Sequence, residues 1–178
     1  MKNRDFLTEK EQDERDIAEG FIKYYNMLKG SSYQIVEHSD APDFRCVDFQ
    51  KNMLNLEITQ TEDRPKDIAA YHGRSNHRSI EALKEHNAKV KEGKANPLER
   101  VSCLSGNVMV TIVDRIKKKM NKDYGKNTAL VVGDTSGCNW DWDMEIEDIG
   151  NSLDLSRNPY DKGIWIISKD KTNIFRID

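Results

Sequence analysis

Two acidic residues, Asp43 and Glu57, are spaced so that together they could bind a hard metal ion. Asp43 enters a short run at residues 44–49, and Glu57 lies late in an alternating run at residues 53–59. A polar turn at residues 50–52 joins the two runs, which predicts a β-hairpin. Residues directly opposite each other on neighbouring strands stand about 5 Å apart. The two carboxylates can therefore lie side by side at one end of the hairpin.

A carboxylate pair at that separation is repulsive unless a positive charge lies between its members. Mg²⁺ takes oxygen ligands from one or two carboxylates and keeps waters for substrate phosphates. Asp43 and Glu57 therefore predict a Mg²⁺ site, with Mn²⁺ as the alternative ion. The competing interpretation is an ordinary hairpin with an acidic turn, because Pro and Asp are common in turns.

Pro42-Asp43, followed by Glu57-Ile58-Thr59 on the next strand, resembles the PD-(D/E)xK motif of restriction-endonuclease-like nucleases. The resemblance implies that the Asp and the Glu bind the metal. It also implies that a lysine two residues after the Glu supports the attacking water. This chain departs from the pattern there, because Thr59 occupies the lysine position and cannot carry a positive charge.

Lys119 is the candidate to replace the missing lysine. It lies in a helix predicted over residues 106–124, whose apolar stripe is Met109, Ile112, Ile116 and Met120. At helical spacing, Lys119 falls beside this stripe. Some members of the superfamily carry the catalytic lysine on a neighbouring helix, so the resemblance implies that role for Lys119, with Lys122 as second choice. The alternative is that Lys119 extends its amine to the surface.

A first helix is predicted from Thr8, because Thr8 and Glu11 fit a capping box and the apolar residues that follow have helical spacing up to Leu28. Glu14 falls on the apolar face of this helix. The resemblance implies a carboxylate from the first helix beside the metal, and Glu14 is the candidate. Alternatively, Glu14 stays in water near the helix start, where its charge favours the helix dipole.

Cationic side chains offer candidate contacts to a phosphate backbone. Lys118 and Lys122 belong to the basic part of the predicted helix, and Arg74 and Arg78 belong to a polar loop predicted after the hairpin. Such groups bind phosphates without reading sequence. His72 in the same loop is an option as general base. The competing interpretation is a solvated, mixed-charge surface.

The composition is that of an ordinary reduced globular protein. The chain has 178 residues, 33% of them charged, and a net charge of −3, which predicts a single domain over residues 1–178 and excludes a uniformly basic binder. Three widely separated cysteines without CxxC spacing argue against a disulfide scaffold and a zinc site. No membrane-length apolar run or apolar signal region occurs, so no membrane partner is expected and the cytoplasm is the expected location.

The periodicity of the remaining runs predicts an α/β fold with a mixed central β-sheet flanked by helices. The further predicted elements are strands at residues 33–37, 128–133, 163–168 and 173–177 and a helix at residues 79–91. The apolar strand at 128–133 follows a helix, as in a parallel crossover. This order resembles the restriction-endonuclease-like core over residues 8–132.

The resulting hypothesis is a Mg²⁺-dependent endonuclease that hydrolyses phosphodiester bonds of nucleic acid, with DNA as the expected substrate. The alternative is a catalytically inactive nuclease-like domain that binds nucleic acid or protein. Thr59 favours that alternative, as do Trp140 and Trp142, which could form a patch for a protein partner. A third hypothesis is a DNA-mimicking inhibitor, which would need one continuous acidic surface. Paired double-strand cutting would require a homodimer, and no motif indicates one.

Overall fold

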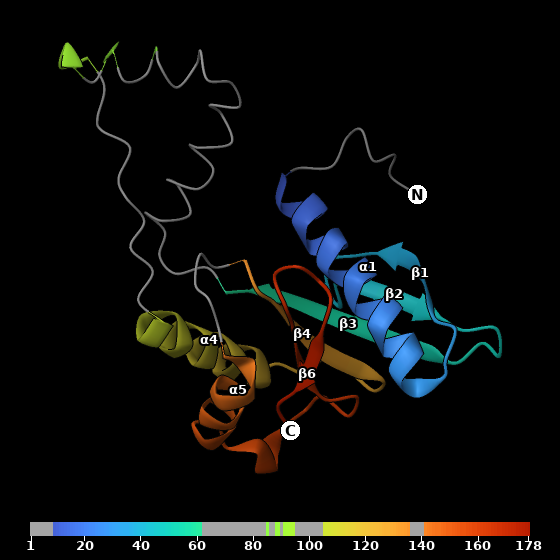
Figure 1. Cartoon of the computed structure of the whole chain (residues 1–178). Coiled ribbons are helices and arrows are strands. Elements are labelled where there is room, and N and C mark those ends of the chain that lie inside the picture. Colours follow the sequence, from blue (N-terminus) through green and yellow to red (C-terminus); the bar gives the residue numbers. More distant parts are fainter. Residues whose placement is uncertain (1–8, 62–84, 86–87, 90, 95–104, 136–140) are drawn as a thin grey trace.

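Six strands form one sheet in the computed structural model, which describes residues 9–61, 85, 88–89, 91–94, 105–135 and 141–178. The strands lie side by side in chain order, and helices cover both faces (Figure 1). The predicted α/β class, with a mixed sheet between helices, is therefore confirmed. The strands are β1 Gln34–His38, β2 Phe44–Val47, β3 Met53–Gln60, β4 Thr128–Gly133, β5 Ile164–Ile167 and β6 Ile174–Arg176. The helices are α1 Glu9–Lys29, α4 Ser105–Met120 and α5 Trp142–Asn151, with a short 3-10 turn at Leu155–Arg157.

The sheet changes from antiparallel to parallel pairing at β3. The strands β1, β2 and β3 pair antiparallel through short turns, whereas β3, β4 and β5 run parallel. A parallel pair needs a long crossover, and α4 lies in the first crossover and α5 in the second. The last strand, β6, returns antiparallel to β5 and forms the predicted closing hairpin.

One core lies between α1 and the sheet. Alternate residues of β3, namely Leu54, Leu56 and Ile58, are buried against the apolar side of α1. The helix approaches β4 closely, because a Cβ added at Gly133 would stand 2.3 Å from the Cδ1 atom of Ile17. The glycine therefore allows α1 to pack directly on the sheet.

A second core lies on the opposite face, under α4 and α5. Ile112 and Ile116 of α4 and Ile149 of α5 pack there with Leu130, Val132, Ile164 and Ile166 of the two central strands. Because β4 and β5 are buried on both faces, every residue of both strands is buried, which explains their continuous apolar runs.

The acidic segment that follows β4 contains α5. The half-buried Trp142 packs against the second core, and its ring is tilted against that of Phe175 of β6, with centroids 6.0 Å apart. Trp142 thus contributes to the edge of the core, and its part in a patch for a protein partner stays a prediction. Trp140 and most of the helix predicted at residues 79–91 lie outside the described residues. No helix in the described segments is long and apolar enough to span a membrane.

Candidate active site

The register of β2 and β3 brings the two candidate metal ligands together. Phe44 of β2 stands opposite Leu56 of β3, so the adjacent positions place Asp43 opposite Glu57. Phe44 and Leu56 face α1, and side chains alternate along a strand, so both carboxylates belong to the face that α4 covers. The Asp43 Oδ2 atom accepts a hydrogen bond of 2.6 Å from the backbone N–H of Ile58. The hairpin therefore fixes both the position and the orientation of Asp43.

The amine of Lys119 enters the same site from α4. Its Nζ atom donates to Glu57 Oε1 and forms an ion pair with that carboxylate. The Glu57 side chain is only 3% exposed and the Lys119 side chain 25%. The amine of Lys119 therefore contacts a buried acid and does not simply extend to the surface.

Two tyrosines contact Lys119. The amine lies 5.8 Å from the ring centroid of Tyr124, and the Tyr160 hydroxyl donates a 3.1 Å hydrogen bond to the Lys119 carbonyl. The two rings stack with their centroids 5.9 Å apart. Burial, followed by the nearby charge of Glu57, raises the pKa of Tyr124, so its hydroxyl stays protonated. The sequence predicted no site role for either tyrosine, and the position of Tyr160 depends on the tertiary fold.

The site holds more negative charge than its surroundings neutralise. Burial raises the pKa of Asp43 to about 6, and the charges of Glu57 and Glu14 add to the rise, while the Ile58 N–H and the Lys119 amine oppose it. Glu57 Oε2 is buried and has no hydrogen-bond partner within the described part of the chain. A buried carboxylate oxygen without a partner is costly, so the site favours an additional cation.

The donors that are present fit a small oxygen-seeking cation. Asp43 and Glu57 supply carboxylate oxygens, and Mg²⁺ commonly uses one or two carboxylates and completes its shell with water. Across the described ranges, no group of three or more His, Cys, Asp or Glu side chains could hold a metal. The predicted third ligand, Glu14, pairs instead with Lys10 at 3.4 Å and acts on Asp43 through its charge. The structure therefore offers a two-carboxylate site.

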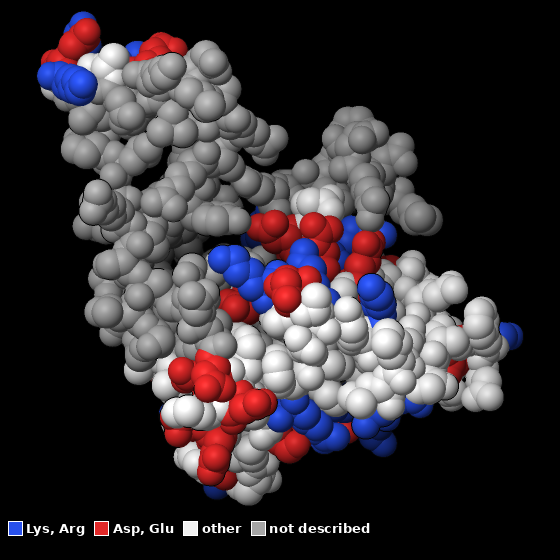
Figure 2. Space-filling view, in the orientation of Figure 1, with Lys and Arg blue, Asp and Glu red and all other residues white. Residues whose placement is uncertain are grey.

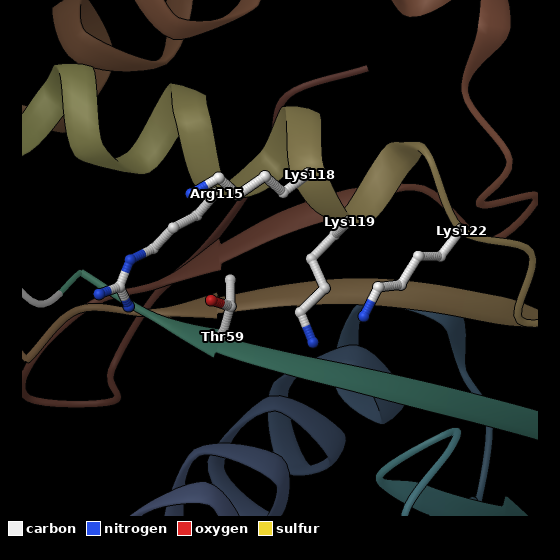
Figure 3. A pocket seen from close by; sticks show the side chains of 5 residues that line it. All are labelled: Thr59, Arg115, Lys118, Lys119 and Lys122. Atoms are coloured by element: carbon white, nitrogen blue, oxygen red, sulfur yellow. The ribbon is translucent and has the colours of Figure 1, made fainter.

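An open pocket of about 290 Å³ adjoins the carboxylates along β3. Its lining consists of Thr59, Arg115, Lys118, Lys119 and Lys122. Figure 3 shows that the side chains of Arg115 and Lys119 extend from α4 toward β3, where Thr59 points back at them, and that Lys122 reaches the same space from the turn after α4. Lys118 extends along α4 toward Arg115 (Figure 3). Two of the predicted phosphate contacts, Lys118 and Lys122, therefore belong to one pocket with Lys119.

Arg115 is a lining residue to which sequence analysis gave no site role. Its guanidinium donates a 2.7 Å hydrogen bond to the carbonyl of Gln60 at the end of β3. The signal was present, because Arg115 precedes Lys118 by three residues and Lys119 by four, and residues at these spacings are neighbours on a helix surface.

Other predicted residues lie elsewhere or outside the described part. Arg74, Arg78 and His72 belong to residues that the structure does not describe. His38 stacks on Phe44, with ring centroids 4.6 Å apart, so it has a packing role beside the hairpin.

The charged surface is mixed on the face shown in Figure 2. Asp and Glu gather over α5, whereas Lys and Arg are interspersed with acidic residues over the middle of the molecule. The continuous acidic surface that a DNA mimic would need is not present on that face.

The resemblance to the PD-(D/E)xK nucleases remains a prediction, and the residues that it concerns are Asp43, Glu57 and Lys119. Comparisons with protein-family models, with curated proteins and with solved structures found no match to this chain.

Proposed function

We propose that the chain is a Mg²⁺-dependent nuclease that hydrolyses phosphodiester bonds of nucleic acid, with DNA as the expected substrate. The observation that carries the proposal is the convergence of Asp43, Glu57 and the Lys119 amine at one end of the hairpin. Two carboxylates can hold a metal that activates water for phosphodiester hydrolysis, and a nearby amine can stabilise the charge that develops on the phosphate. Strongly perturbed acids also cluster at functional sites, and Asp43 is such an acid.

The residues have separate roles in this proposal. Asp43 and Glu57 would hold the metal, which when bound polarises the scissile phosphate and lowers the pKa of a coordinated water. The Ile58 N–H keeps the Asp43 carboxylate oriented. Lys119 would orient the attacking water or stabilise the charge that develops on the phosphate. Its backbone is held by the Tyr160 hydroxyl, which keeps the amine near Glu57.

Cations of α4 and of the turn after it would hold the nucleic acid strand. Lys118 and Lys122 are exposed and line the pocket beside the carboxylates. Arg74 and Arg78 remain predicted contacts. Because phosphate contacts release counterions, binding should weaken as the salt concentration rises.

The test is cleavage of plasmid and oligonucleotide substrates with Mg²⁺, with Mn²⁺ and with EDTA. Glu57→Gln should lower cleavage at least 100-fold, because it removes a ligand charge while keeping the side-chain volume. Glu37→Gln is the matched control, since Glu37 is half exposed on β1 and pairs with Arg45. Cleavage that is unchanged in both Asp43→Ala and Glu57→Gln would refute the proposal.

The alternative function is a nuclease-like module that binds nucleic acid without cutting it, and Thr59 in place of lysine favours it. Calorimetric titration with Mg²⁺ separates the two. Metal binding that Glu57→Gln abolishes, together with cleavage, supports the nuclease. Oligonucleotide binding in EDTA, without metal binding or cleavage, supports the module.

A further inference from the structure

We propose that the pocket between Thr59 and α4 binds the phosphate next to the one that is cleaved. The pocket holds four cationic side chains, from Arg115, Lys118, Lys119 and Lys122, and among the residues that the structure describes no carboxylate lines it. That this anion is the neighbour of a cleaved phosphate rests on the proposed function. The binding of an anion in the pocket rests on the pocket alone.

The charge balance of the pocket favours an anion. Lys119 is neutralised by Glu57, but the described part of the chain shows no ion pair for Lys118 or Lys122. The Arg115 guanidinium donates to the Gln60 carbonyl at 2.7 Å. The positive charges of Lys118 and Lys122, which line the same pocket, repel one another. An anion held between them would remove that repulsion.

The chemistry of the lining favours a phosphate among the anions. Arginine presents a planar fork of donors that suits phosphate oxygens, and lysine adds mobile point charges. The Thr59 hydroxyl, which lies on the side of Arg115 in Figure 3, supplies a short neutral donor from the opposite wall. A volume of about 290 Å³ is at the lower end of ligand pockets, which run from about 300 to 1,000 Å³. That space suits one phosphate and part of its sugar.

The position of the pocket identifies which phosphate it takes. Thr59 lies two residues beyond Glu57 on the same face of β3, and a strand rises about 3.3 Å per residue. The pocket wall therefore lies about 7 Å from the carboxylate site, which is comparable to the separation of neighbouring phosphates along one strand of nucleic acid. A strand that runs along β3 would present one phosphate to the carboxylates and the next to the pocket.

In the resembled family pattern, Thr59 means the loss of a lysine. In this arrangement it also leaves the pocket open. A lysine at position 59 would extend into the pocket and fill it with its own ammonium group. Threonine leaves the space open, and Lys119 supplies the amine at Glu57 from the helix. The substitution thus exchanges a strand lysine for a phosphate subsite.

The first experiment measures the binding of inorganic phosphate in EDTA at constant ionic strength, by calorimetry or ³¹P NMR. Lys118→Ala combined with Lys122→Ala should weaken phosphate binding at least fivefold, and Thr59→Val about threefold. Lys117→Ala is the matched control, because Lys117 is exposed on the same helix and does not line the pocket. Equal phosphate affinity in the wild type and the double variant, or an equal loss in the control, would overturn the assignment of the pocket.

The second experiment locates the phosphate in the substrate. Oligonucleotides carry one uncharged methylphosphonate, placed at either neighbour of the cleaved bond. One of the two positions should lower kcat/KM at least tenfold in the wild type and less than twofold in the double variant. A loss at neither position, or the same loss in both proteins, would overturn the neighbouring-phosphate assignment. Phosphate binding without any cleavage would uphold the pocket and refute the nuclease, so the two failures are distinguishable.

Discussion

Replacing Asp43 by asparagine should change stability in a pH-dependent way. Compared with the wild type, the variant should be favoured more at pH 8 than at pH 4. The pKa of Asp43 is raised from its ordinary value of 3.8 to about 6, mainly by burial. The folded state therefore binds the Asp43 proton more tightly than the unfolded state does. This contribution to stability is complete below about pH 4 and is lost as the pH rises through 6. Asparagine keeps a carbonyl for the Ile58 N–H and has no charge to bury.

The magnitude follows from linkage. Each pKa unit corresponds to about 1.4 kcal/mol, so a rise of this size penalises the ionised form by about 3 kcal/mol at most. Asp43 is partly open to solvent, which screens the penalty, so about 1–2 kcal/mol is expected. The unfolding free energy of Asp43→Asn minus that of the wild type should therefore be about 1–2 kcal/mol larger at pH 8 than at pH 4.

The assay is urea unfolding in EDTA at pH 4, 6 and 8, with Asp40→Asn as control because Asp40 is exposed in the same turn. Curves for wild type and Asp43→Asn that stay parallel across this range would refute the reasoning. Adding Mg²⁺ at pH 8 should stabilise the wild type and leave Asp43→Asn unchanged, because the variant lacks one ligand charge. A metal effect of equal size in both proteins would place the metal elsewhere.

Three further results are expected. Lys119→Met should abolish cleavage and lower the urea unfolding free energy by about 2 kcal/mol, because it leaves a buried carboxylate unpaired; a loss below about 0.5 kcal/mol would contradict this. Gly133→Ala should cost about 1–3 kcal/mol by overpacking against Ile17, and Ile17→Ala in the same chain should recover part of the loss. The Lys118→Ala and Lys122→Ala pair should reduce the salt dependence of DNA binding by about one to two phosphate contacts in a log–log plot, and an unchanged slope would remove these residues from the interface.

Most of the described fold could be predicted from periodicity, because its elements bury regular faces. The strand predicted at residues 128–133 has the bounds of β4, since a fully buried strand appears as an unbroken apolar run between turns. The predicted closing hairpin and first helix agree with the structure within a few residues at their described ends. Local sequence thus determines elements whose faces are uniform in polarity.

The helix α5 was missed although its signal was present. Trp142, Ile146 and Ile149 recur at helical spacing and pack against the second core. Acidic residues fill most of the positions between them, and no helix was predicted from this acidic segment. In this short helix at the edge of the core, three apolar residues make the packing contacts. The polarity of the whole segment therefore does not predict whether it is helical.

The candidate site was predictable where it depends on local geometry. Asp43 and Glu57 meet through hairpin register, and Lys119 was singled out by its position on a helix face. The contribution of Tyr160 was not accessible, since it lies 41 residues beyond Lys119 and reaches it only through the tertiary fold. Tyr124 follows Lys119 by five residues, so its proximity was available from the sequence.

The two departures from the family pattern, Thr59 and Lys119, have a common physical explanation. Both side chains face the space between β3 and α4, and that space can hold a limited number of ammonium groups. With Lys119 bonded to Glu57, a lysine on the strand two residues further along would place another cation among Arg115 and the lysines of α4. Like charges that close repel each other unless an anion separates them. Threonine on the strand is therefore the partner expected for a lysine on the helix, and the open space between them is suited to a substrate phosphate.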